Sequence, residues 1–124
     1  MHTVVETPGF LSDAAALGMR EAERFEILTF LAMNPDAGDV IAGTGGARKL
    51  RFSGRGKGKS GGYRVITFFT GAAFPVFLLN AFAKNEKANL TKMESATLKK
   101  ILSAITTTYM AKDLGGSQMK NKKA

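Results

Sequence analysis

The most constraining feature of the sequence is an almost continuously apolar run at residues 75–82, Pro-Val-Phe-Leu-Leu-Asn-Ala-Phe. Such a run predicts a central strand that is buried on both faces. Pro75 is compatible with this strand because it stands at its first position. Residues 63–69 are rich in β-branched and aromatic side chains and predict a second strand. Four phenylalanines of this region are expected in the core: Phe68, Phe69, Phe77 and Phe82.

Helical patterns lie on both sides of these strands. Thr7-Pro8 predicts a helix start, with threonine as N-cap and proline at the first helical position, and Gly18 ends that helix. A second helix is expected over about residues 19–33, because Pro35 pushes the residue before it out of the helical region. Its predicted apolar positions are Phe25, Leu28, Leu31 and Ala32.

A third helix is predicted after residue 90, where Thr91 and Glu94 have the spacing of a capping box. Its apolar stripe, which is expected to pack on the sheet or in part on a partner, comprises Leu98, Ile101, Leu102, Ile105 and Tyr109. Shorter strands are expected at residues 39–41 and 48–52. The order helix, helix, strands, helix predicts one α+β domain over residues 1–114, with a helical hairpin and a mainly antiparallel twisted sheet. Residues 115–124 have the composition of a disordered basic tail.

The charge is distributed unevenly along the chain, whose net charge is +8. Residues 1–39 hold two basic and seven acidic side chains, whereas residues 40–85 hold eight basic ones and no acidic one. Residues 86–124 hold eight basic and three acidic side chains. The middle segment therefore predicts a polyanionic partner, with a solvated basic surface as the alternative.

Several classes of chemistry are disfavoured by the sequence. There is no cysteine, and the single histidine, His2, lies near the terminus, so neither a thiolate metal site nor a Ser/His/Asp triad is expected. The acids lack metal-ligand spacing, and we expect no metal and no cofactor. The Gly-Lys-Gly-Lys-Ser-Gly segment at residues 56–61 imitates a nucleotide-binding loop, but a strand rather than a helix follows it. Glu6 and Asp13 argue against a signal peptide, and no run is long enough for a membrane helix, so we expect a cytoplasmic protein.

Basic side chains remain as candidates for chemistry on a phosphodiester. Lys49 and Arg51 are two positions apart and face the same side of a strand, Arg64 begins the next strong strand, and Lys84 follows the buried strand. Such cations can bind a phosphate, stabilise its developing charge and transfer protons. RNA supplies its own nucleophile, the 2′-hydroxyl. These four are the predicted catalytic residues. The predicted RNA-binding residues are Arg48, Arg55, Lys57, Lys59, Tyr63 and Lys87, although Tyr63 could equally fill a half-buried strand position.

Three blocks in this order resemble the RelE/HigB toxins of type II toxin–antitoxin modules, and especially the branch with a Gly-Lys-Gly-Lys loop. The blocks are residues 43–51, residues 56–66 and the segment from Leu78 to Glu86. The resemblance covers about residues 3–112. It implies a RelE-like fold, with two N-terminal helices packed on the sheet, and metal-independent cleavage of messenger RNA in the ribosomal A site by in-line attack of the 2′-hydroxyl. It also implies inhibition by an antitoxin, often a helix-turn-helix protein, and contact with operator DNA only through the complex with that antitoxin.

The resemblance assigns phosphate binding and transition-state stabilisation to Lys49, Arg51 and Arg64, with a lysine as possible general base. Two positions depart from the pattern of the best-known members. Asn85 stands where they have a second catalytic arginine, and Thr91 stands where they have a C-terminal tyrosine. These departures leave the general acid and base undefined.

Two alternative functions stay open. ParE-type toxins share the architecture but inhibit DNA gyrase without cutting RNA. A non-enzymatic RNA-binding module would show salt-sensitive binding without cleavage. Cleavage of a messenger separates the first interpretation from both alternatives.

Overall fold

The structure is a computed structural model that describes residues 2–53, 62–83 and 90–123, with side chains described up to Tyr109. A five-stranded sheet has the order β1-β5-β4-β3-β2. Its strands are β1 (Val4–Glu6), β2 (Asp39–Val40), β3 (Ala47–Phe52), β4 (Tyr63–Phe68) and β5 (Val76–Ala83). The helices are α1 (Pro8–Leu17), α2 (Glu21–Met33) and α3 (Lys92–Lys123). The predicted α+β class is confirmed.

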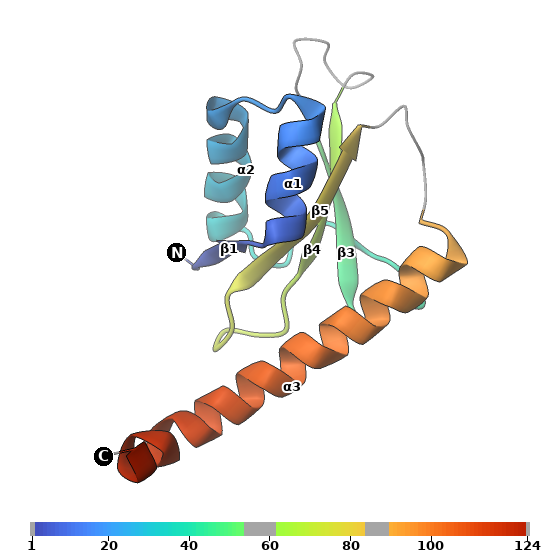
Figure 1. The fold of residues 1–124 in the computed structure, drawn as a ribbon. Coiled ribbons are helices and arrows are strands. Elements are labelled where there is room, and N and C mark those ends of the chain that lie inside the picture. The colour runs from blue at the N-terminus through green and yellow to red at the C-terminus, as the bar shows by residue number, and fades with distance from the viewer. Residues whose placement is uncertain (1, 54–61, 84–89, 124) are drawn as a thin grey trace.

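The two faces of the sheet carry separate cores. One core joins Phe10 of α1 and Leu31 of α2 to Val65 and Leu78 of the sheet. The other joins Ile66 and Phe82 to Leu98 and Leu102 of α3. The helices α1 and α2 therefore cover one face while α3 crosses the other (Figure 1). The strand β5 is buried along nearly its whole length between these layers, as its apolar run predicts.

The predicted helix starts are confirmed in atomic detail. Thr7 caps α1 through a hydrogen bond that its hydroxyl accepts from the Phe10 amide at 3.3 Å, and Gly18 ends the helix at φ 68°. A left-handed residue at this position favours glycine. Thr91 and Glu94 form the reciprocal capping box of α3, at 2.9 and 3.1 Å.

One detail of the predicted α2 face is wrong. Phe25 is 67 % exposed, and Ile27, which is 1 % exposed, fills the core in its place. The predicted α3 stripe packs on the sheet only in part, since Leu98 and Leu102 are buried and Ile101 is 43 % exposed. Both helices carry apolar residues at several adjacent angles, so the periodicity alone does not select the buried ones.

The strand β1 is the element that the sequence did not predict. It is three residues long and pairs in parallel with β5, from Val4–Val76 to Glu6–Leu78, so the sheet is mixed. At the other end of the chain α3 continues to Lys123 without a break at Leu114. Residues 115–123, which the composition predicts as a disordered tail, are therefore part of α3, and the domain boundary at Leu114 remains a prediction.

Candidate functional site

Two rows of side chains cross the sheet on the face that α3 partly covers. In the first row Arg51 of β3 is paired directly with Arg64 of β4, which is paired with Phe82 of β5. Directly paired residues of antiparallel strands lie on the same face with their Cβ atoms about 4.5–5.5 Å apart. Arg51 and Arg64 are therefore direct neighbours on the sheet, as the adjacency of their two strands predicts.

The second row lies two residues along the strands. It comprises Asp39 of β2, Lys49 of β3 and Ile66 of β4. Lys49 is thus on the same face as Arg51, as the period of two predicts. No local pattern in the sequence points to Asp39 at this site, because only the β2–β3 register places it opposite Lys49.

The three cations differ in their surroundings. Arg51 is exposed, whereas Arg64 and Lys49 are half-buried. The Nε atom of Arg64 is fully buried and has no hydrogen-bond partner among the described residues. Lys49 borders a hollow of about 260 Å3 together with Ile66, Phe82 and Leu90. An exposed guanidinium beside a half-buried one is a suitable arrangement for binding one phosphate, because both can donate N–H groups to its oxygens.

The structure separates two other predicted RNA-binding residues from this surface. Arg48 alternates with Lys49 and faces the opposite side of β3, where its guanidinium donates a hydrogen bond to the Gly38 carbonyl at 3.1 Å. Tyr63 is 1 % exposed, and its hydroxyl donates to a Glu23 carboxylate oxygen at 3.1 Å. Of the two roles expected for Tyr63, base stacking is incompatible with this burial, and the side chain fills the core instead.

The remaining predicted site residues lie outside the described residues. They are Arg55, Lys57, Lys59, Lys84 and Lys87, together with the atypical Asn85. Thr91 is described, and both its hydroxyl and its amide are used in capping α3. Tyr109 packs against Phe74 and Phe77, with ring centroids 5.6 and 5.3 Å apart, and so belongs to the core under α3.

Among the described residues no three His, Cys, Asp or Glu side chains gather as a metal would require. No helix over these residues combines the length and apolar character needed to cross a membrane.

Comparison with known proteins gives this arrangement a family. The family model for the RelE toxin of the RelE/RelB toxin–antitoxin system matches residues 32–123. The chain belongs to the RelE toxin family. The match includes β3 and β4, so the Lys49, Arg51 and Arg64 surface lies within the part of the chain that is RelE-like.

The fold is also similar to a solved RelE structure. An arginine-to-alanine double variant of the E. coli toxin RelE in the free state matches with a TM-score of 0.50 and 16 % sequence identity. The match covers 69 % of this chain and 86 % of that one. At this identity the likeness concerns the fold, and the family match carries the assignment: this RelE-family chain is the toxin of a toxin–antitoxin module, and its partner is an antitoxin.

Proposed function

We propose that this RelE-family toxin is a ribosome-dependent, metal-independent messenger-RNA endonuclease that inhibits translation. The observation that carries the proposal is the direct pairing of Arg51 with Arg64, with Lys49 on the same sheet face. Three cations on one face of a rigid sheet are suited to hold an RNA phosphate. Family membership supports the same activity.

The chemistry needs no group beyond these side chains and the RNA itself. The 2′-oxygen attacks the adjacent phosphorus, the bond to the 5′-oxygen breaks, and a 2′,3′-cyclic phosphate remains. Negative charge builds on the non-bridging oxygens, and the two guanidinium groups stabilise it. One proton leaves the 2′-hydroxyl and one reaches the 5′-oxygen. We assign Lys49 to proton transfer, because it is the amine among the described cations of this face and an amine changes protonation more readily than a guanidinium. Lys84 is proposed as a fourth contributor on the basis of sequence alone.

The decisive experiment is a cell-free translation reaction that contains one defined messenger, with cut sites mapped by primer extension. The same messenger without ribosomes is the parallel sample. We expect cuts only in translated RNA, within A-site codons. Arg64→Met should abolish them, whereas Lys100→Met, which removes the same charge from the exposed side of α3, should not.

Each other outcome points to a different function. An intact messenger in both samples would refute the nuclease, and inhibition of DNA gyrase supercoiling would then identify a ParE-like toxin. Salt-sensitive binding to ribosomes without cleavage or gyrase inhibition would identify the non-enzymatic RNA-binding alternative.

A further inference from the structure

The cationic face of the sheet also carries an acidic side chain, Asp39 of β2. Asp39 is paired directly with Lys49, so both side chains lie on this face with their Cβ atoms about 4.5–5.5 Å apart. Arg51 stands two positions beyond Lys49 on β3 and is therefore the diagonal neighbour of Asp39. A carboxylate thus borders the surface that is proposed to hold the RNA phosphate.

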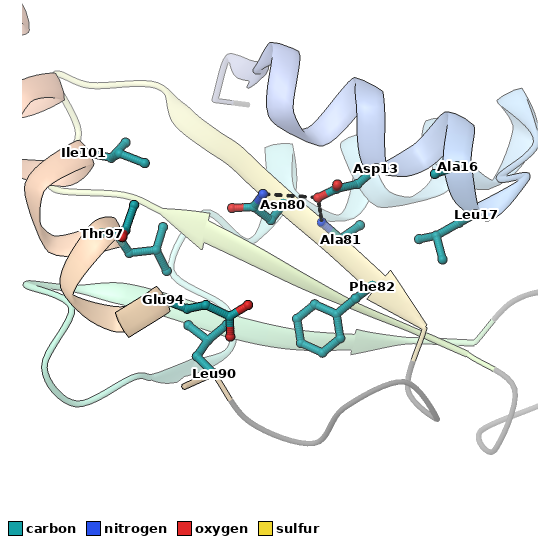
Figure 2. A pocket seen from close by; sticks show the side chains of 11 residues that line it. Asp13, Ala16, Leu17, Asn80, Ala81, Phe82, Leu90, Glu94, Thr97 and Ile101 are labelled. Atoms are coloured by element: carbon teal, nitrogen blue, oxygen red, sulfur yellow. Dashed lines mark hydrogen bonds between the residues drawn. The ribbon is translucent and has the colours of Figure 1, made fainter. Parts of the chain in front are cut away.

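The Asp39 carboxylate differs from nearby acids because it is open to a ligand. Its side chain is exposed and makes no hydrogen bond or ion pair with another residue in the described part of the chain. Asp13, in the cavity between α1, β5 and α3, already accepts two amides of β5 at 3.1 and 2.9 Å (Figure 2). Glu94, on the α3 side of that cavity, accepts the Thr91 amide at 2.9 Å in the helix cap. Of these three carboxylates, Asp39 is the one that lies beside the cations and that a substrate can reach.

This position of an acid is unfavourable if the face only binds phosphate. A carboxylate repels a phosphate group and weakens the attraction that Lys49 and Arg51 exert on it. Attraction between Asp39 and Lys49 would stabilise the β2–β3 pair, but exposed pairs of this kind contribute little to the free energy of unfolding. A chemical role in the reaction accounts better for a carboxylate at this place.

Cleavage of RNA requires a proton acceptor as well as a proton donor. One proton leaves the 2′-hydroxyl and another reaches the 5′-oxygen. A protonated amine and a guanidinium have protons to donate but cannot accept one, whereas a carboxylate accepts without donating. In their charged forms Lys49, Arg51 and Arg64 therefore lack the acceptor that the reaction needs, and the carboxylate on the adjacent strand has it.

We propose that Asp39 is the general base of the cleavage reaction and that Lys49 is its general acid. The Asp39 carboxylate takes the proton of the 2′-hydroxyl as the 2′-oxygen attacks the phosphorus. The Lys49 ammonium gives a proton to the 5′-oxygen as the bond between this oxygen and the phosphorus breaks. These steps leave a neutral carboxyl and a neutral amine side by side, and transfer of a proton from the carboxyl to the amine restores both.

The inference rests on the proposed nuclease function and adds the group that takes up the first proton. Arg51 and Arg64 keep their role of stabilising the charge on the non-bridging oxygens. Lysine has a longer and more flexible stem than aspartate, so the ammonium can approach the phosphate from a side that the carboxylate does not occupy. In-line attack needs this freedom, because the 2′- and 5′-oxygens stand on opposite sides of the phosphorus.

The test measures single-turnover cleavage of one defined messenger on programmed ribosomes, over a range of protein concentrations. We expect Asp39→Asn to lower the maximal rate about 100-fold or more, since a general base contributes on that order. The protein concentration that gives half the maximal rate should stay the same or fall, because the variant removes a charge that repels RNA. Asp39 is exposed, so the Tm should change by no more than about 3 °C.

The matched variants are Asp39→Glu and Asp36→Asn. Glutamate keeps the carboxylate on a stem one methylene longer, so it should recover at least about a tenth of the wild-type rate. Asp36 is exposed in the turn before β2, and its variant changes the net charge equally. It should therefore cut as the wild-type protein does.

Two further readouts separate proton transfer from a structural role. Sodium formate supplies a free carboxylate and should raise cleavage by Asp39→Ala about tenfold, whereas the same concentration of sodium chloride should not. A messenger with sulfur in place of the 5′-oxygen at the cut site has a leaving group that needs no proton. This messenger should restore cleavage by Lys49→Met but not by Asp39→Asn, because only the first variant lacks the acid.

Three results would overturn the proposal: a wild-type rate for Asp39→Asn, a loss of rate that higher protein concentration restores, or formate and chloride acting equally on Asp39→Ala. The first would leave Asp39 as a structural partner of Lys49, and the second would make it a binding residue. All three are measured against a wild-type protein that cuts. They are therefore distinguishable from failure of the nuclease itself, in which the wild-type protein leaves the messenger intact and both proposals are refuted.

Discussion

At the scale of single residues, burial distinguishes two arginines that the sequence presents as equivalent. Arg51 is exposed and can bind phosphate without first losing water. Arg64 holds its Nε atom buried and unpartnered among the described residues. An unsatisfied buried donor costs about 1–3 kcal/mol of folding free energy. A protein that keeps such a donor on its candidate catalytic face carries the cost for function rather than for stability.

Replacing Arg64 should therefore separate activity from stability. We expect Arg64→Met to raise the free energy of unfolding by about 1 kcal/mol, because the buried donor is lost, while cleavage falls at least 100-fold. Denaturant unfolding followed by circular dichroism and the translation assay measure the two effects. Arg51→Met is the control: it should reduce cleavage with less than about 0.5 kcal/mol change in stability. A destabilised Arg64→Met protein would show that Arg64 is a structural residue.

Tyr63 gives a second prediction at this scale. Tyr63→Phe leaves the Glu23 carboxylate, which is 8 % exposed, without one of its donors. We expect the free energy of unfolding to fall by about 1–2 kcal/mol and cleavage by the folded protein to be unchanged. Unfolding in urea measures the first quantity. An unchanged free energy of unfolding would mean that the Tyr63 hydroxyl does not stabilise the fold through Glu23. Stacking of Tyr63 on an RNA base would then have to be considered again.

The sequence predicted the part of the site that depends on strand alternation. The alternation of side chains along a strand predicts that Lys49 and Arg51 share a face. The position of Arg64 at the start of a strong strand predicts that it lies near them. Asp39 did not follow, because its position beside Lys49 is set by the β2–β3 register, which is a pairing across a turn. Burial of Tyr63 did not follow either, since it depends on Glu23 of a distant helix.

At the scale of the elements, β1 and α2 are joined by one ion pair. The Arg24 guanidinium donates to both Glu6 carboxylate oxygens, at 2.9 and 3.2 Å. Its hydrogen bonds and charge attraction to Glu6 raise the pKa of Arg24 above its ordinary value. A raised pKa means that the folded state holds this proton more tightly, so the stabilisation is present at neutral pH, well below the ordinary arginine pKa, and is lost as the pH rises through the raised pKa.

Removing this pair should loosen the short parallel strand. We expect Arg24→Met to lower the free energy of unfolding by about 1 kcal/mol, a modest value because both side chains keep some contact with water. Hydrogen exchange should become faster at the β1 amides first. Arg20→Met is the matched control, since Arg20 is 74 % exposed and its Nε lies 3.6 Å from Glu23. Equal losses in the two variants would show that the β1–α2 contact has no special role.

The elements that the sequence predicted are those with a strong local signal. These signals depend only on residues close together in the sequence. They are the helix caps at Thr7 and Thr91, the end of α1 at Gly18 and the apolar run of β5. The strand β1 has only three residues, and its pairing with β5 is a contact between segments some 70 positions apart. Such a strand forms because β5 has unpaired backbone groups along its outer edge. That edge exists only in the folded sheet, so the segment Val4–Glu6 carries no local signal for it.

At the scale of the whole molecule, the net charge of +8 governs how the toxin meets its partners. The helices α1 and α2, which hold most of the acidic side chains of residues 1–39, cover one face of the sheet (Figure 1), whereas Lys49, Arg51 and Arg64 lie on the other face, so the molecule is electrically asymmetric. A polyanion is attracted to the basic face and repelled by α1 and α2. An antitoxin that occupies the basic face would therefore be expected to use an acidic segment.

This asymmetry predicts a steep salt dependence of ribosome binding. Each phosphate contact contributes a slope of roughly −0.7 to −0.9 to the plot of log K against log salt concentration, because bound cations are released. Arg51→Met should remove one phosphate contact and so make the slope less steep by about one. Lys100→Met, on the side of α3 away from the sheet face, should leave the slope unchanged. Sedimentation with ribosomes over a range of potassium concentrations measures both. If the two variants lost the same slope, binding would reflect net charge alone, and the sheet face would have no privileged contact with RNA.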